Sequence, residues 1–186
     1  MRFGRLVLIC TAAMVLACCS MEGVQHVSAV GEDHKELTDI LVFPLYHAFY
    51  GIAIGPDGHG LRSSTRVFTK PFRFSSGENL MRKQIQGRGI IIPPYIFIGT
   101  SRYVNNWLFI KKGCAPLVVS REMIYGGSPI VMSSSKNEDN KRCIDILLST
   151  KPDQTTLKRI FNSKNLQQDI KVEMDAHDVA LLEGNR

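Results

Sequence analysis

The chain has 186 residues, of which 44% are hydrophobic and 22% are charged, and its formal net charge is +6 at pH 7. These proportions are ordinary for a globular protein, and the sequence shows neither an internal repeat nor a long low-complexity segment. A chain of this length predicts one domain, which buries roughly two-thirds of its surface and needs neither a metal nor a disulfide to fold.

The first 19 residues combine a basic start with an apolar run that ends at two adjacent cysteines. Arg2 and Arg5 precede an uncharged stretch over residues 6–16, which is shorter than the roughly 20 residues of a membrane-spanning helix. Such a run is typical of the apolar region of a secretory signal peptide. Val15-Leu16-Ala17-Cys18 stands at its end and resembles the lipobox of bacterial lipoproteins, in which an aliphatic, a tolerant and a small position precede the modified cysteine.

The resemblance covers residues 1–18 and implies export and lipid anchoring. It implies cleavage before Cys18, which removes a signal peptide over 1–17. It also implies attachment of a diacylglyceryl group to the Cys18 thiol, and this lipid makes the membrane a binding partner of the protein. Two or three acyl chains hold a protein stably at a bilayer. Cys19 stands where an Asp retains enterobacterial lipoproteins in the inner membrane, so the resemblance favours the periplasmic face of the outer membrane. The alternative is an ordinary cleaved signal peptide.

Composition divides the remaining chain into a tether and a domain. Residues 18–36 are mixed and polar without a sustained apolar period, which predicts a flexible lipid-anchored tether, and residues 37–186 are expected to form a single β-rich domain. An exported protein is permitted disulfides. Cys114 and Cys143 are the candidate pair, and the alternative is two buried free thiols.

Short β-prone runs dominate the domain. The expected strands are residues 39–46, 49–54, 63–69, 90–92, 95–98, 103–112, 115–125, 129–133, 142–148 and 169–174. The turn residues between Gly55 and Gly60 predict a hairpin that pairs 49–54 with 63–69. Residues 133–141 predict a polar loop between strands. Three phenylalanines of one parity are expected to share a face: Phe68, Phe72 and Phe74.

A helix is expected near the C-terminus. Thr150-Lys151-Pro152-Asp153 offers a threonine cap, a proline for the first turn and an acid near the positive end of the helix dipole. Leu157, Ile160 and Phe161 then have the spacing of an apolar helical face. Many short strands with one helix predict a mainly β fold, an antiparallel β-sandwich or barrel-like domain with one C-terminal helix, rather than a βαβ architecture.

A basic segment is the main candidate for an interaction. Its seven cations oppose the single acid Glu78 and are Arg62, Arg66, Lys70, Arg73, Arg82, Lys83 and Arg88. The pattern predicts contact with an anionic surface, such as lipid headgroups, lipopolysaccharide or an acidic protein. The alternative is a set of solvated strand edges, where Lys and Arg prevent edge-to-edge pairing. The export signal argues against nucleic acid as a partner.

Patterns for catalysis or for metal binding are weak. Ser133 and Lys136 match the Ser-x-x-Lys of penicillin-recognising enzymes, but the accompanying Lys-Thr-Gly does not occur in the chain. His47, His59 and Asp57 lack the spacing of a metal site. The sequence therefore predicts a protein that is not an enzyme and that has no cofactor or metal.

The favoured hypothesis is a lipid-anchored envelope protein whose non-catalytic domain binds another envelope protein or supports the envelope. One alternative is a periplasmic carrier or sensor of a small ligand, in which Tyr95, Tyr103, Trp107 and Phe109 line a cavity instead of packing in a core. A second alternative is an immunity-type lipoprotein that neutralises a periplasmic toxin.

Overall fold

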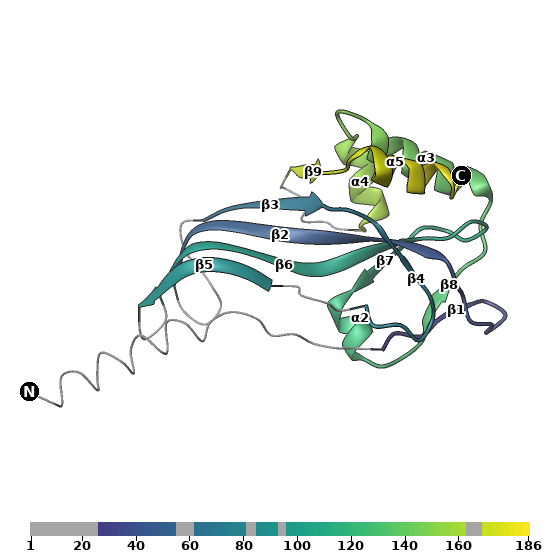
Figure 1. The fold of residues 1–186 in the computed structure, drawn as a ribbon, viewed down its shortest axis with the longest axis horizontal. Coiled ribbons are helices and arrows are strands. Elements are labelled where there is room, and N and C mark those ends of the chain that lie inside the picture. Colours follow the sequence, from purple (N-terminus) through teal and green to yellow (C-terminus); the bar gives the residue numbers. More distant parts are fainter. Residues whose placement is uncertain (1–25, 55–61, 81–84, 93–95, 163–168) are drawn as a thin grey trace, which may run out of the picture.

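The structure is a computed structural model that describes residues 26–54, 62–80, 85–92, 96–162 and 169–186 (Figure 1). Several residues singled out from the sequence lie outside the described residues: Cys18, Cys19, Asp57, His59, Arg82, Lys83 and Tyr95.

Two strands of 15 residues form the spine of the fold. β2 (Ile40–Ile54) and β6 (Ile96–Ile110) pair antiparallel along their whole length. β3 (Arg62–Phe68) pairs with β2, and β5 (Ile85–Ile92) pairs with the outer part of β6. Figure 1 shows these four strands side by side, extending together out of the body of the molecule.

Shorter strands complete a mainly β fold. β4 (Phe72–Phe74) pairs with β2, β7 (Leu117–Ser120) pairs with β6, and β9 (Ile170–Val172) runs parallel to β3. A separate two-stranded parallel sheet joins β1 (Ala29–Gly31) to β8 (Ile130–Met132). The mainly β, sandwich-like class is confirmed, and the described strands do not close into a barrel.

Four helices are described: α2 (Arg121–Tyr125), α3 (Asn137–Leu148), α4 (Gln154–Ile160) and α5 (Ala176–Glu183). Asp153 caps α4 by accepting a hydrogen bond from the Thr155 amide at 3.0 Å. Figure 1 shows α3, α4 and α5 together on one side of the long strands.

The inner part of the large sheet is covered on both faces because its residues alternate between two apolar clusters. Ile40 and Val42 of β2 belong to a cluster that includes residues of β1, β4 and β8, and we call this side the β1 face. Leu41 and Phe43 belong to a cluster that includes residues of α3, α4 and α5, and we call this side the helix face. The large sheet is therefore the middle layer of the body.

The first hairpin is confirmed, but its pairing is shifted along β2. Of the expected run 49–54, residues 49–51 pair with β3, and the rest of β3 pairs with residues 45–48. The runs 39–46 and 49–54 form one strand rather than two. Pro44 is accommodated next to a shift of register between β2 and β6 at Leu45 and Tyr46.

The predictions for 133–148 and for 115–125 are wrong. The expected polar loop over 133–141 ends at residue 136, and α3 replaces its remainder and the expected strand 142–148. The buried apolar residues of α3, Cys143, Ile144 and Leu147, have helical spacing. The expected strand 115–125 ends at Ser120 and continues as α2. The C-terminal part therefore contains three helices instead of one.

The predicted tether ends too late. Val27, Ala29 and Val30 are buried, and β1 pairs with β8, so the domain includes residues 26–36.

The expected shared face of the phenylalanines is also wrong. Phe68 lies in the cluster of the helix face and Phe74 in that of the β1 face, because residues 69–71 interrupt the alternation between β3 and β4.

Cys114 and Cys143, the candidate disulfide pair, are both free thiols in the structure. Cys114 packs against the cluster of the β1 face, whereas Cys143 belongs to the cluster of the helix face. Burial raises the pKa of Cys143 to about 12 and also raises the pKa of the half-buried Cys114. These thiols are structural residues of two different layers.

Candidate functional site

A cavity of about 820 Å³ lies on the β1 face, beside the middle of the two long strands. Its lining includes Tyr46 of β2 together with Val104 and Trp107 of β6. The aromatic residues Phe72 and Phe74 of β4 also line it. The volume lies within the range of roughly 300–1,000 Å³ that is typical of small-ligand pockets. The alternation that builds the core thus also supplies an apolar pocket wall.

Three cationic side chains border the same cavity: Lys70, Arg73 and Arg102. Arg73 forms an ion pair with Asp39, and Lys70 forms one with Asp175. The nearest carboxylate to Arg102 is that of Glu173, at 3.8 Å from Nη2, which is too long for a hydrogen bond. Glu173 therefore offsets part of the Arg102 charge while the guanidinium donors stay available to a bound group.

Arg102 is oriented by an aromatic ring of the pocket. Its guanidinium carbon lies 5.8 Å from the centroid of the Tyr46 ring, within the range of a cation–π interaction. Burial raises the pKa of Tyr46, and the charge of Arg102 opposes this shift. Tyr46 therefore stays a neutral phenol, which is both an apolar surface and a hydrogen-bond donor.

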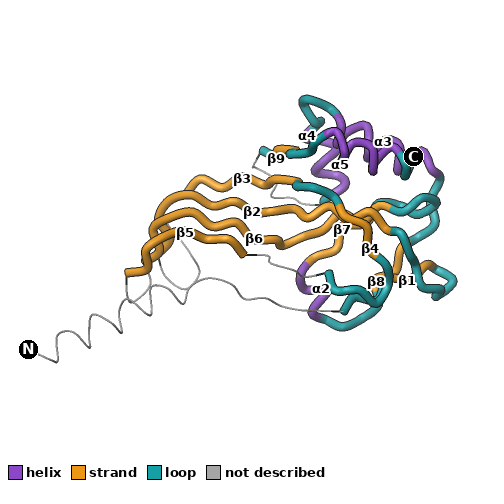
Figure 2. The backbone as a smooth tube through the Cα atoms, viewed as in Figure 1, coloured by secondary structure: helices purple, strands orange, loops and turns teal. Residues whose placement is uncertain are grey.

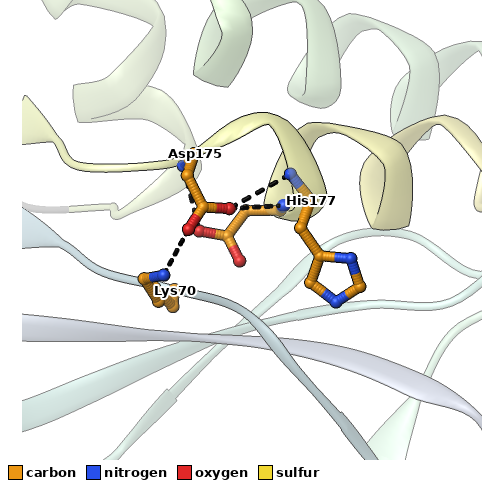
Figure 3. A network of polar contacts seen from close by, with 4 residues as sticks. Lys70, Asp175 and His177 are labelled. Carbon is orange, nitrogen blue, oxygen red and sulfur yellow. Dashed lines mark hydrogen bonds and ion pairs between the residues drawn. The ribbon is translucent and has the colours of Figure 1, made fainter.

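The rim at Lys70 is fixed to the C-terminal helix. Figure 3 shows Lys70 directed at Asp175, which precedes α5 and turns its carboxylate toward the start of that helix. Asp175 Oδ1 accepts hydrogen bonds from the amides of His177 and Asp178, both at 3.1 Å. The Lys70 ammonium and these amides hold the pKa of Asp175 at about 2. This network ties the loop between β3 and β4 to α5.

Polar residues of the N-terminal segment and of the loop after β4 also line the cavity. The Gly77 carbonyl accepts a hydrogen bond from His26 Nδ1 at 2.9 Å, and Glu78 Oε2 accepts one from the Ser75 amide at 2.8 Å. The Asn79 Oδ1 atom is buried and has no hydrogen-bond partner in the described part of the chain. Buried acceptors are normally paired, so this oxygen is suited to a donor group of a ligand or to water.

The aromatic residues named as a possible cavity lining do not converge. Trp107 borders the cavity, and Phe109 is buried in the neighbouring core. Tyr103 instead lies beside His47, and its hydroxyl shares a hydrogen bond of 2.9 Å with His47 Nδ1. The carrier hypothesis thus keeps one of its residues and gains Tyr46 and Arg102, which the sequence did not mark.

The predicted basic segment is only partly brought together. Lys70 and Arg73 border the cavity, whereas Arg66 pairs with His47 in the register of β2 and β3. Arg62 and Arg88 occupy outer positions of β3 and β5. Arg102 joins the cavity from a distant strand, because β6 pairs with β2 and sets Arg102 opposite Ala48.

Further tests of the site concern metals, membrane spans and known proteins. Among the described residues, no group of three or more His, Cys, Asp or Glu side chains is placed to hold a metal ion. Within the same residues, no helix has the length and apolar character needed to cross a bilayer. Comparisons of the chain with protein-family models, with curated proteins and with solved structures found no match.

Proposed function

We propose that this chain is a lipid-anchored envelope protein whose β-rich domain binds, without chemical conversion, a small ligand with an acidic group and an apolar body. The observation that carries this proposal is the cavity of about 820 Å³ in which aromatic side chains and Arg102 lie together. It favours the carrier or sensor hypothesis over binding of an envelope protein and over the immunity-type alternative.

Each part of the cavity matches one part of such a ligand. A carboxylate or phosphate beside Arg102 receives charge-assisted hydrogen bonds, which are roughly twice as strong as neutral ones. The apolar body packs against Tyr46, Phe72 and Trp107, where it leaves water. Lys70 and Arg73 add positive charge at the rim, although their carboxylate partners reduce its effect.

The location of the binding protein rests on a different part of the chain. The resemblance of Val15-Leu16-Ala17-Cys18 to a lipobox supports anchoring through lipid on Cys18. A protein held in this way samples ligands near a membrane surface, where amphiphilic anions concentrate. Anchoring and ligand binding are separate claims and have separate tests.

Trp107 makes the binding test simple, because it is the one tryptophan of the chain and is buried at the cavity. We expect a saturable change in its fluorescence on titration with decyl phosphate below the micellar concentration. Decyltrimethylammonium, which has the same tail and the opposite charge, is expected to bind much more weakly. Inorganic phosphate alone is expected to bind weakly, since it lacks the apolar body.

Two arginine variants make the test specific. Arg102→Gln is expected to weaken decyl phosphate binding by about tenfold or more, because a hydrogen bond to a charged group contributes about 1.5–3 kcal/mol. Arg121→Gln is the matched control: Arg121 also stacks on a tyrosine, Tyr125, at 5.1 Å, but it does not line the cavity. Equal affinity for the two amphiphiles, or equal effects of the two variants, contradicts the proposal.

A further inference from the structure

The outer part of the large sheet, formed by β2, β3, β5 and β6, is not covered by the layers that pack on its inner part. Figure 2 shows β2, β3, β5 and β6 continuing beyond the helices and beyond the sheet of β1 and β8. Apolar side chains are exposed there: Tyr50 is 49% exposed, Ile52 37% and Ile98 40%. In the inner part of the same strand, Ile40 to Phe43 are fully buried. Exposed apolar side chains gathered at one place indicate a binding surface.

Strand register assembles an apolar block at this end. Ile52, Ala53 and Ile54 pair with Ile98, Phe97 and Ile96, and these pair on their other side with Ile90, Ile91 and Ile92. All nine positions are apolar, and we call them the apolar tip. Directly behind it, Gly51 pairs with Gly99, which pairs with Gly89, so a row of three glycines crosses the sheet.

Positive charge follows immediately behind the apolar tip. Arg62 stands opposite Gly51 at the glycine row, and Arg88 stands opposite Thr100 in the next row. Arg66 and Arg102 lie further back. The four strands together contain these four arginines and no acidic residue. An apolar end backed by cations is complementary to a surface with anionic groups above an apolar layer.

We propose that the apolar tip inserts into the interfacial region of an anionic lipid bilayer, with Arg62 and Arg88 at the phosphate headgroups. Three residues of a strand span about 10 Å, which matches the roughly 5–10 Å to which interfacial segments enter a membrane. The charge argues against a second copy as the occupant, because the arginines of two copies repel each other.

The backbone limits how deep the apolar tip enters. The outer edge of β5 pairs with no strand among the described residues. Its free amide and carbonyl groups need water or headgroups, since unpaired backbone groups are not tolerated in the hydrocarbon core. The contact is therefore interfacial, and the sheet does not span the bilayer. It is a contact additional to the proposed lipid anchor and does not depend on the ligand cavity.

Site-specific fluorescence tests the contact in the full chain. An NBD fluorophore is attached through Ile98→Cys or, separately, Ile52→Cys, and the chain is reconstituted in vesicles of phosphatidylcholine and phosphatidylglycerol that contain nitroxide-labelled lipid. Val131→Cys is the matched control, because Val131 is an apolar strand residue that is 46% exposed on β8. The unsubstituted chain gives the background from native thiols.

We expect nitroxide quenching of the fluorophore at positions 52 and 98, a blue shift of its emission, and neither change at position 131. Replacing phosphatidylglycerol with phosphatidylcholine is expected to reduce the quenching at the apolar tip. Equal quenching at positions 98 and 131 overturns the proposal. A blue shift at position 98 without quenching by lipid nitroxide also overturns it, because this result places the apolar tip against protein.

Discussion

Leu147→Ala in α3 is expected to destabilise the domain strongly, whereas Ile146→Ala is expected to do so less. Leu147 is 2% exposed within the cluster of the helix face, and Ile146 is only half-buried. The mutation of Leu147 removes three carbons at about 0.8 kcal/mol each, which gives about 2.4 kcal/mol. The cavity that remains adds to this, so the loss of unfolding free energy falls within about 2–5 kcal/mol.

Equilibrium unfolding in urea, followed by Trp107 fluorescence, measures both variants. With a denaturant slope of about 2 kcal/mol/M, Leu147→Ala is expected to lower the midpoint by about 1 M or more. Lys141→Ala, which removes an exposed side chain from the same helix, is the control and is expected to leave the midpoint almost unchanged.

The order of the two effects distinguishes a helix from a strand at 142–148. In a strand, Ile144, Ile146 and Leu148 share one face, so Ile146→Ala is the more costly of the two mutations. In α3, Cys143, Ile144 and Leu147 are buried together. A larger loss of stability for Ile146→Ala than for Leu147→Ala contradicts the structure.

Asp175→Asn is expected to lower stability at pH 7, and its difference from the native chain is expected to shrink as the pH falls from about 4 to 2. The pKa of Asp175 is lowered from 3.8 to about 2 in the fold, chiefly by Lys70, so its contribution is present above the unfolded pKa and is lost as the folded carboxylate protonates; thermal melts across this range measure it. Glu183→Gln, at the other end of α5, is the control, and an Asp175→Asn difference that is constant with pH contradicts the account. For the free thiols, peptide mapping after iodoacetamide labelling at pH 8 is expected to show modification of Cys114 before Cys143, whose pKa burial raises to about 12. Protection of both until a reductant is added indicates a disulfide instead.

The hairpin of β2 and β3 and the mainly β class were predictable because their signals are local. The turn residues after Gly55 and the apolar runs on each side predict the pairing of β2 with β3. The alternation of Ile40 to Phe43 between two clusters follows the period of a strand. In α4, Leu157 is buried and Ile160 half-buried, as their helical spacing predicts, although Asp153 rather than Thr150 caps the helix.

Predictions failed where tertiary packing decides the outcome. The apolar residues of 142–148 fit either a strand or a helix, and burial against the helix face selects α3. The polar residues 137–141 show no helical apolar pattern, so the first turns of α3 could not be predicted from them. In these turns Asn140 donates a hydrogen bond to the Lys111 carbonyl at 2.7 Å. The segment 26–36 reads as a tether because its strand, β1, has only three residues and depends on β8.

The candidate site was only partly predictable, because it is built from pairs that are distant in sequence. Lys70 and Arg73 belong to a visible basic segment, and Trp107 was named as a possible ligand contact. Arg102 and Tyr46 are 56 residues apart, and only the register of β2 and β6 brings them together. The apolar tip has the same origin, since three separate runs meet there through strand pairing.

The central claim is that this binding domain is held at a membrane through Cys18, and fatty-acid labelling tests it most directly. Cells that express the full chain, Cys18→Ser or Cys19→Ser are grown with labelled palmitate, and their membranes are fractionated. We expect label and membrane retention in the native chain and in Cys19→Ser, and loss of label in Cys18→Ser. Label that persists on the Cys18→Ser chain contradicts the account.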